Sequence, residues 1–196
     1  MTQASEITIR RALPGDAEGI AGLARETFVE TFGYLYRPED LAAFLKTSQS
    51  VAAYAPLLGD QRVGIWVAED TGHDLVGFLT AGPCKLPAPH REATAGEIRQ
   101  LYLRTSVQRE GLGTRLLVTG LDWLEARGHS PLYVGVWSGN LGAQRLYARY
   151  GFEKIGEYDF PVGKQLDREF ILRQRKPLTT PGPSAPEGGA GNGPRL

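Results

Sequence analysis

The sequence predicts an α/β (α+β) domain in which about four helices cover a mixed sheet of about seven strands. Two observations predict it. Short segments with an apolar residue at every second position alternate along the chain with segments whose apolar residues recur at helical spacing. Glycine and proline separate these segments, as expected of turns. The predicted order is β-α-α-β-β-β-α-β-α-β-β, which describes one mixed domain.

The first half of the chain contains three strands and two helices in this prediction. Apolar and polar residues alternate at 7–9 and predict a first strand. A helix follows, and its apolar face consists of Ile20, Leu23, Ala24, Thr27 and Phe28. The acidic turn at 38–40 predicts the start of a second helix. Strands are then expected at 63–69 and 75–81, on either side of a turn.

The second half begins with a loop at 82–95, because three prolines fall within that stretch. Strands and helices then alternate to the end of the domain. Their predicted ranges are a strand at 98–103, a helix at 112–124, a strand at 132–136, a helix at 140–150 and strands at 153–158 and 167–173.

Composition restricts the class of protein. Lys+Arg and Asp+Glu both number 22 in a chain of 196 residues, so charge gives no argument for a nucleic-acid partner. No apolar run approaches the ~20 residues that span a bilayer, and the first six residues lack the order of a signal peptide. Cys84 is the only cysteine, which excludes an internal disulfide and a thiolate metal cluster. We therefore expect a cytoplasmic protein, a monomer or homodimer, with no metal and no membrane or nucleic-acid partner.

The last twenty residues, 177–196, are rich in Pro, Gly, Ser and Thr and contain almost no large apolar residue. Such a segment cannot bury enough surface to offset its ordering entropy. We expect a disordered tail there and a single folded domain at 1–176.

The clearest candidate for a ligand-binding segment lies between a predicted strand and a predicted helix. It consists of Gln108, Arg109, Glu110, Gly111, Leu112, Gly113 and Thr114. Two glycines let the backbone approach a ligand closely, because they have no Cβ. The first amides of a helix have no internal partner and favour an anion such as a pyrophosphate. Taken alone, the segment fits a tight strand-to-helix connection equally well.

A second motif follows about thirty residues later and consists of Asn140, Ala143, Leu146, Tyr147, Gly151 and Phe152. Together with the Gln-x-x-Gly-x-Gly segment at 108–113, it closely resembles the GNAT superfamily of acetyl-CoA-dependent N-acetyltransferases. The resemblance is strongest over residues 96–158. Within the superfamily, Glu26-Thr27-Phe28, Gly135-Val136-Trp137 and Asp167 look like the bacterial spermidine/spermine-type acetyltransferases.

The resemblance implies a GNAT fold whose fourth and fifth strands splay apart to admit the pantetheine arm of acetyl-CoA. It implies that the main chain of Leu101, Tyr102 and Leu103 bonds the arm and that the amides at 109–114 hold the pyrophosphate. Asn140 would bond the arm from the other side, and Tyr147 would lie near the thioester sulfur. Spacing agrees, because Asn140, Ala143 and Tyr147 fall on one helix face, with a small residue between two polar ones.

The implied reaction is direct attack of an amine on the acetyl group in a ternary complex. Tyr147 would donate a proton to the leaving thiolate. Glu97 is the candidate base, although pairing with Arg99 explains this carboxylate equally well, and Glu30 and Asp159 are weaker candidates. Cys84 as a nucleophile is disfavoured, because the sequence places no histidine beside it.

The acceptor is expected opposite the coenzyme, against an apolar wall of Phe28, Phe32, Tyr34 and Tyr36, with Glu26 and Glu30 attracting a cation. The same residues also fit an ordinary core and a solvated helix face. A small-molecule primary amine such as a polyamine is the first hypothesis for the acceptor. An amino acid, an aminoglycoside, a protein N-terminus, a longer acyl donor, and a coenzyme-A-binding sensor without catalysis remain open.

Overall fold

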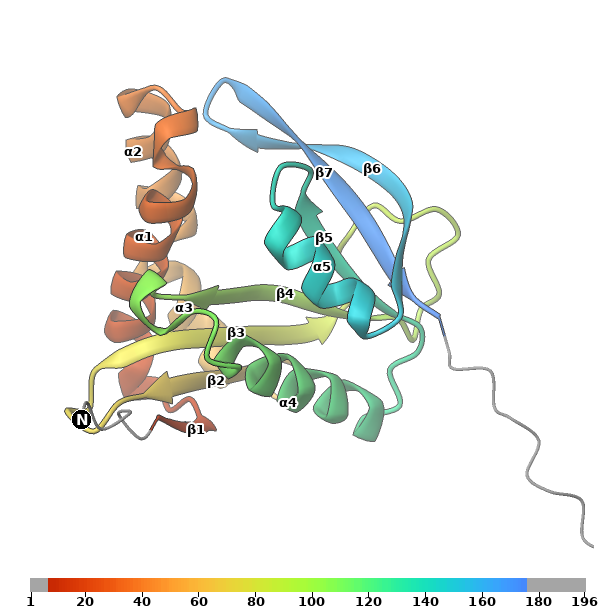
Figure 1. Ribbon diagram of the computed structural model, residues 1–196, viewed down its shortest axis with the longest axis horizontal. Helices are drawn as coiled ribbons and strands as arrows, with labels where there is room; N and C mark the ends of the chain where they lie inside the picture. The colour runs from red at the N-terminus through yellow and green to blue at the C-terminus, as the bar shows by residue number, and fades with distance from the viewer. Residues whose placement is uncertain (1–6, 176–196) are drawn as a thin grey trace, which may run out of the picture.

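The computed structural model describes residues 7–175, which form one seven-stranded sheet with helices on both faces. Figure 1 shows the arrangement. The strands are β1 (Thr8–Arg11), β2 (Gly64–Glu69), β3 (Leu75–Pro83), β4 (Gly96–Leu103), β5 (Leu132–Trp137), β6 (Phe152–Val162) and β7 (Gln165–Gln174). The α-helices are α1 (Ala17–Phe32), α2 (Pro38–Ser48), α3 (Val51–Gly59), α4 (Leu112–Ala126) and α5 (Leu141–Arg149). Short 3-10 turns lie at η1 (Pro14–Asp16), η2 (Gly33–Leu35) and η3 (Thr105–Val107).

The strand order in the sheet is β1-β2-β3-β4-β5-β7-β6. Neighbouring strands are antiparallel except β4 and β5, which are parallel. All seven predicted strands are present, so the predicted mixed sheet is confirmed.

The sheet opens between β4 and β5. The two strands pair at only three positions, the last of which joins Ile98 to Val134. Beyond it β4 continues to Leu103 beside β3, while β5 continues to Trp137 beside β7. The predicted splay is therefore confirmed. In the antiparallel pairing of β3 with β4 the register shifts at Thr80 and Ala81, and such an irregularity bends a strand.

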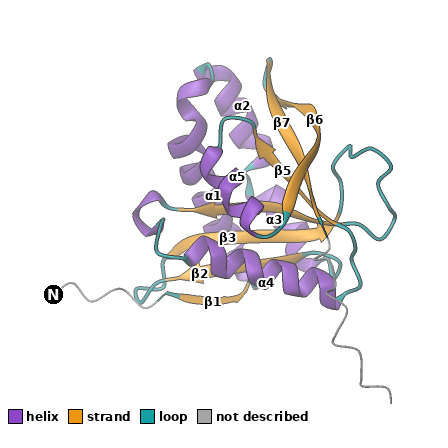
Figure 2. Cartoon of the chain, turned by 45° about the vertical axis from the view of Figure 1, so that its right-hand side comes forward, coloured by secondary structure: helices purple, strands orange, loops and turns teal. Residues whose placement is uncertain are grey.

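Helices α4 and α5 lie on one face of the sheet, while α1 and α3 cover the other (Figure 2). Leu116, Leu117 and Leu124 of α4 pack with sheet residues such as Ile98 and Val134. On the opposite face, residues of α1 and α3, among them Ile20, Ala24 and Tyr54, pack against Val67 and Phe78. Helices thus cover both faces of the sheet, and the split between β4 and β5 is an interruption of an otherwise continuous sheet.

Helix α3 was not predicted from the sequence. Its nine residues are mostly apolar, so no polar face marks a helical period, and Pro56 lies inside it. The start of the helix is capped by Ser50, whose hydroxyl accepts a hydrogen bond from the Ala53 amide at 3.2 Å. Tyr54 anchors the helix in the core.

The predicted loop at 82–95 begins later than expected, because β3 runs on to Pro83. The proposed tail at 177–196 lies outside the described residues. Within 7–175, no helix has the length and apolar character needed to cross a membrane.

Candidate active site

The turn before α4 exposes backbone amides. Gly111 adopts a left-handed conformation with φ of 82°, and Arg109 has φ of 69°. In the described part of the chain, the amides of Gly111, Leu112, Gly113 and Thr114 have no hydrogen-bond acceptor. The first internal bond of the helix runs from Arg115 N to Gly111 O at 3.0 Å. Four free amides at a helix N-terminus attract an anion, because their dipoles add.

Three of the predicted coenzyme residues, Gln108, Gly113 and Leu103, meet at this turn. A Cβ placed on Gly113 would lie 3.1 Å from Leu103 Cδ1 at the end of β4 and 4.0 Å from Leu146 Cδ2 on α5. Gln108 fixes the turn to β4, because its side-chain amide donates to Leu103 O at 3.1 Å. The start of α4, the end of β4 and α5 therefore meet beside the split.

Helix α5 carries the second predicted motif. Asn140 caps its start, since Oδ1 accepts from Ala143 N at 3.0 Å. Its Nδ2 group has no acceptor within residues 7–175. Tyr147 is 5 % exposed, and its ring packs against Phe152 with centroids 6.0 Å apart.

The hydroxyl of Tyr147 likewise has no hydrogen-bond partner in the described chain. Burial, together with the negative charge of Glu169, raises the pKa of Tyr147 above its usual value. The phenol is therefore protonated near neutral pH, as an ordinary tyrosine is, and it carries a proton that it could donate. That it acts on a thioester stays a prediction.

Glu97 is buried near the start of β4. Its Oε2 atom accepts a hydrogen bond from Lys85 N at 2.6 Å, which ties the loop after β3 to the sheet. Burial raises the pKa of Glu97 above its usual value. Arg99 does not form an ion pair with it among the described residues; its guanidinium donates instead to Pro83 O at 2.7 Å. The role of Glu97 as a base stays a prediction.

The predicted acceptor wall is partly assembled. Phe28 and Phe32 belong to a buried cluster with Tyr36, Phe44 and Val162, and Phe32 packs against Trp137 with centroids 5.7 Å apart. Tyr34 does not join this cluster and is 76 % exposed.

The two carboxylates expected to attract a cation are engaged by neighbours. Glu26 pairs with Arg104 at 3.0 Å, and Glu30 accepts from the Thr105 hydroxyl at 2.9 Å. These contacts join α1 to the connection between β4 and α4.

Two carboxylates on β7 were not predicted as site residues. The hydroxyl of Tyr36 donates to Asp167, and that of Tyr158 donates to Glu169 Oε2 at 2.5 Å. Asp167 is buried and Glu169 is half-buried. Positions 167 and 169 lie on the same face of the strand, because side chains alternate between its two faces. This spacing of two residues was the sequence signal that could have grouped the two carboxylates.

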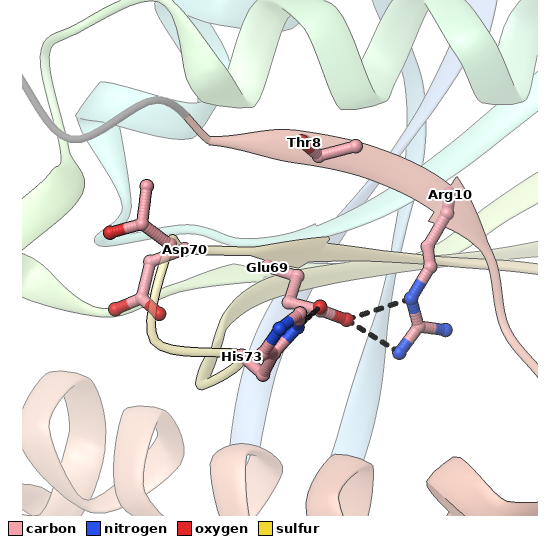
Figure 3. Close-up of a pocket in the computed structure, with 6 residues that line it drawn as sticks. Thr8, Arg10, Glu69, Asp70 and His73 are labelled. Carbon is pink, nitrogen blue, oxygen red and sulfur yellow. Dashed lines mark hydrogen bonds and ion pairs between the residues drawn. The ribbon is translucent and has the colours of Figure 1, made fainter.

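A separate hollow of about 220 Å³ lies against β1 and the β2–β3 turn (Figure 3). Arg10 pairs there with Glu69 at 2.7 Å, and His73 Nδ1 lies 2.5 Å from Glu69 Oε1. Strands β2, β3 and β4 lie between β1 and the split. The charges in this hollow already have partners, so we assign it no role.

Comparison with known proteins agrees with this geometry. The family described as "Acetyltransferase (GNAT) family" matches residues 24–152. The chain belongs to this family of N-acetyltransferases.

Individual N-acetyltransferases are similar to most of this chain. An uncharacterised N-acetyltransferase of Lactobacillus delbrueckii is 28 % identical over 163 residues, which cover 81 % of this chain and 91 % of that protein. One of Mycobacterium tuberculosis is 29 % identical over 161 residues and covers 80 % and 96 % of the two chains.

Solved structures share the fold. The PaiA N-acetyltransferase of Thermoplasma acidophilum, solved in complex with coenzyme A, superposes with a TM-score of 0.69 at 19 % identity, over 87 % of this chain and 99 % of that one. An N-acetyltransferase of Staphylococcus aureus gives a TM-score of 0.65 at 23 % identity, over 86 % and 98 %. The predicted GNAT membership is confirmed, while the closer resemblance to spermidine/spermine-type enzymes stays a prediction.

Proposed function

We propose that this chain transfers the acetyl group of acetyl-coenzyme A to a primary amine of a small molecule, by direct attack in a ternary complex. One observation carries the proposal: four amides without an acceptor lie at the start of α4, beside a sheet that opens between β4 and β5. A pyrophosphate suits these amides. The extended pantetheine arm suits the opening, since the free edge of β4 can form main-chain hydrogen bonds to it, as it would to an added strand.

We propose a role for each predicted residue in this arrangement. The segment 108–114 would hold the pyrophosphate, and the main chain of 101–103 would bond the arm. Asn140 would add a bond through its free Nδ2 group, and Ala143 leaves room beside it. Tyr147, further along the same helix face, would reach the sulfur.

The chemistry follows from these positions. The amine nitrogen forms a bond to the acetyl carbon while an amide of β4 stabilises the charge that develops on the carbonyl oxygen. As the carbon–sulfur bond breaks, Tyr147 gives its proton to the thiolate. The proton that the ammonium must lose before attack goes to a base, for which the sequence suggests Glu97.

The acceptor face favours a cation. Asp167 and Glu169 lie on one side of β7, near the aromatic cluster that contains Phe32 and Trp137. Carboxylates beside aromatic faces attract ammonium groups. We therefore place a polyamine first among acceptors, ahead of an amino acid, an aminoglycoside or a protein N-terminus.

The proposal is tested by measuring thiol release from acetyl-CoA with spermidine, spermine, simple monoamines, amino acids and a peptide with a free N-terminus. Mass spectrometry of the products shows whether an acetyl group was transferred. We expect release above the hydrolysis rate with a polyamine and weaker release with monoamines. Tight coenzyme binding without transfer to any amine would favour a coenzyme sensor, and faster reaction with a longer acyl-CoA would correct the donor.

A further inference from the structure

The carboxylate of Glu169 lies at the point where the sheet opens. Glu169 pairs with Trp137 of β5 and with Tyr158 of β6. A Cβ placed on Gly135 would lie 3.2 Å from Glu169 Oε2 and 3.2 Å from the Tyr158 hydroxyl. Gly135 is the first residue of β5 beyond the last pair with β4, between Ile98 and Val134. Because position 135 has no side chain, the carboxylate and the phenol occupy that space.

The surroundings of Glu169 favour proton uptake. Within residues 7–175, no Lys, Arg or His forms an ion pair with it. The titratable groups that face it are Tyr158 from β6, Asp167 from β7, Glu97 and Tyr102 from β4, Tyr147 from α5 and Tyr36 after η2. Burial and the charges of Asp167 and Glu97 raise the pKa of Glu169 above its usual value. A cation that approaches the split therefore meets a carboxylate with no competing cation.

Glu97 is held differently. Its Oε2 atom is bonded by Lys85 N at 2.6 Å, so part of its capacity as an acceptor is used to anchor the loop after β3. That loop brings Leu86 over the same glycine, where a Cβ on Gly135 would lie 3.0 Å from Leu86 Cδ2. Glu97 also lies opposite Tyr133, in the part of β4 that is still paired with β5, so its position suits a structural role.

We propose that Glu169, in place of Glu97, takes the proton from the acceptor ammonium before attack. The inference rests on the proposed acetyl transfer. Glu169 becomes a neutral acid as the ammonium becomes a free amine, and it later returns the proton to water. After attack, Tyr147 protonates the leaving thiolate and regains a proton from the nitrogen of the intermediate. The hydroxyl of Tyr158 donates to Glu169 at 2.5 Å and orients it.

The test compares Glu169→Gln and Glu97→Gln, with Glu157→Gln as a control at an exposed position of β6. Glutamine keeps a carbonyl oxygen, so the bonds from Tyr158 and Lys85 are able to persist in the two buried variants. Thiol release is measured as kcat/KM for the best amine between pH 6 and pH 10. Coenzyme affinity is measured by calorimetry to confirm an intact fold.

We expect Glu169→Gln to lower kcat/KM about 10²–10⁴-fold at neutral pH with coenzyme affinity unchanged. Its activity should then rise about tenfold per pH unit, because only amine already free in solution reacts and the amine pKa is ~10. Glu169→Asp should restore part of the rate, and Glu157→Gln should match the wild type.

Three results would overturn the inference. The first is near-wild-type kinetics of Glu169→Gln with an unchanged pH profile. The second is the same loss and pH slope in Glu97→Gln instead, which would return the base role to that residue. The third is an absence of thiol release from the wild type with every amine, which would remove the proposed function itself and is distinguished by the wild-type assay alone.

Discussion

Replacing Tyr147 with phenylalanine removes one hydroxyl and leaves the packing of the ring intact. The ring is buried against Phe152, and the hydroxyl has no partner in the described chain. No internal hydrogen bond is lost, so the free energy of unfolding should change by less than about 1 kcal/mol. If the phenol protonates the leaving thiolate, turnover should fall about 10²–10⁴-fold, a rise of roughly 3–5 kcal/mol in the barrier.

The assay measures thiol release at saturating acetyl-CoA and amine, with the coenzyme dissociation constant from calorimetry and the unfolding midpoint from urea titration. Tyr150→Phe is the matched control, since it makes the same change one turn further along the chain, after the end of α5. The predicted signature for Tyr147→Phe is a large loss of kcat, with the coenzyme dissociation constant and the unfolding midpoint both unchanged. Near-normal turnover, or an equal loss in the control, would remove Tyr147 from the chemistry.

Three further predictions concern stability and coenzyme binding. Gly120→Val should lower the free energy of unfolding by about 1–3 kcal/mol in urea titrations, because a Cβ there would lie 2.6 Å from Leu79 Cδ2; unchanged stability would contradict the described packing. Asp16→Asn should cost about 1–2 kcal/mol at pH 7, since Asp16 accepts from Arg10 at 2.8 and 3.0 Å. This bond lowers the pKa of Asp16 in the folded state. The stabilisation is therefore present above the pKa of Asp16 in the unfolded chain, ~3.9, and is lost as pH falls through its pKa in the folded state. A difference in unfolding free energy between Asp16→Asn and the wild type that persists below that pKa would refute the assignment. Gly111→Ala should weaken coenzyme binding, as measured by calorimetry. It should also lower the free energy of unfolding by about 1 kcal/mol through the strain of its φ of 82° alone, because open space surrounds the new Cβ. An unchanged coenzyme affinity would count against the turn as the pyrophosphate site.

The sequence predicted the sheet well because its strands alternate or consist of short apolar runs between turn residues. It missed α3, where an almost wholly apolar segment with Pro56 gives no periodic signal. It also predicted that β3 would end before Pro83, although proline is tolerated at the end of a strand. Local pattern therefore identified elements that have one polar side and failed where that contrast was absent.

The candidate site divides in the same way. The residues of the coenzyme side lie in two short segments, 108–114 and 140–147, so their spacing alone indicated one turn and one helix face. The carboxylates of the acceptor side are different. Glu169 reaches the split only because β7 pairs with β5 in one register, and no local pattern specifies a contact between strands so far apart in sequence.

The opening in the sheet has a local cause that the two motifs do not contain. Ala81 of β3 pairs with Ile98, and Thr80 pairs with Gln100, so Arg99 is an extra residue in β4. Its guanidinium crosses to Pro83 O, and a Cβ placed on Gly82 would lie 2.9 Å from Arg99 Nη2. The extra residue follows directly after the last pair with β5, and a bulge increases the local twist of a strand. We infer that this bulge turns β4 away from β5 directly after their last pair, and so contributes to the opening beside the start of α4.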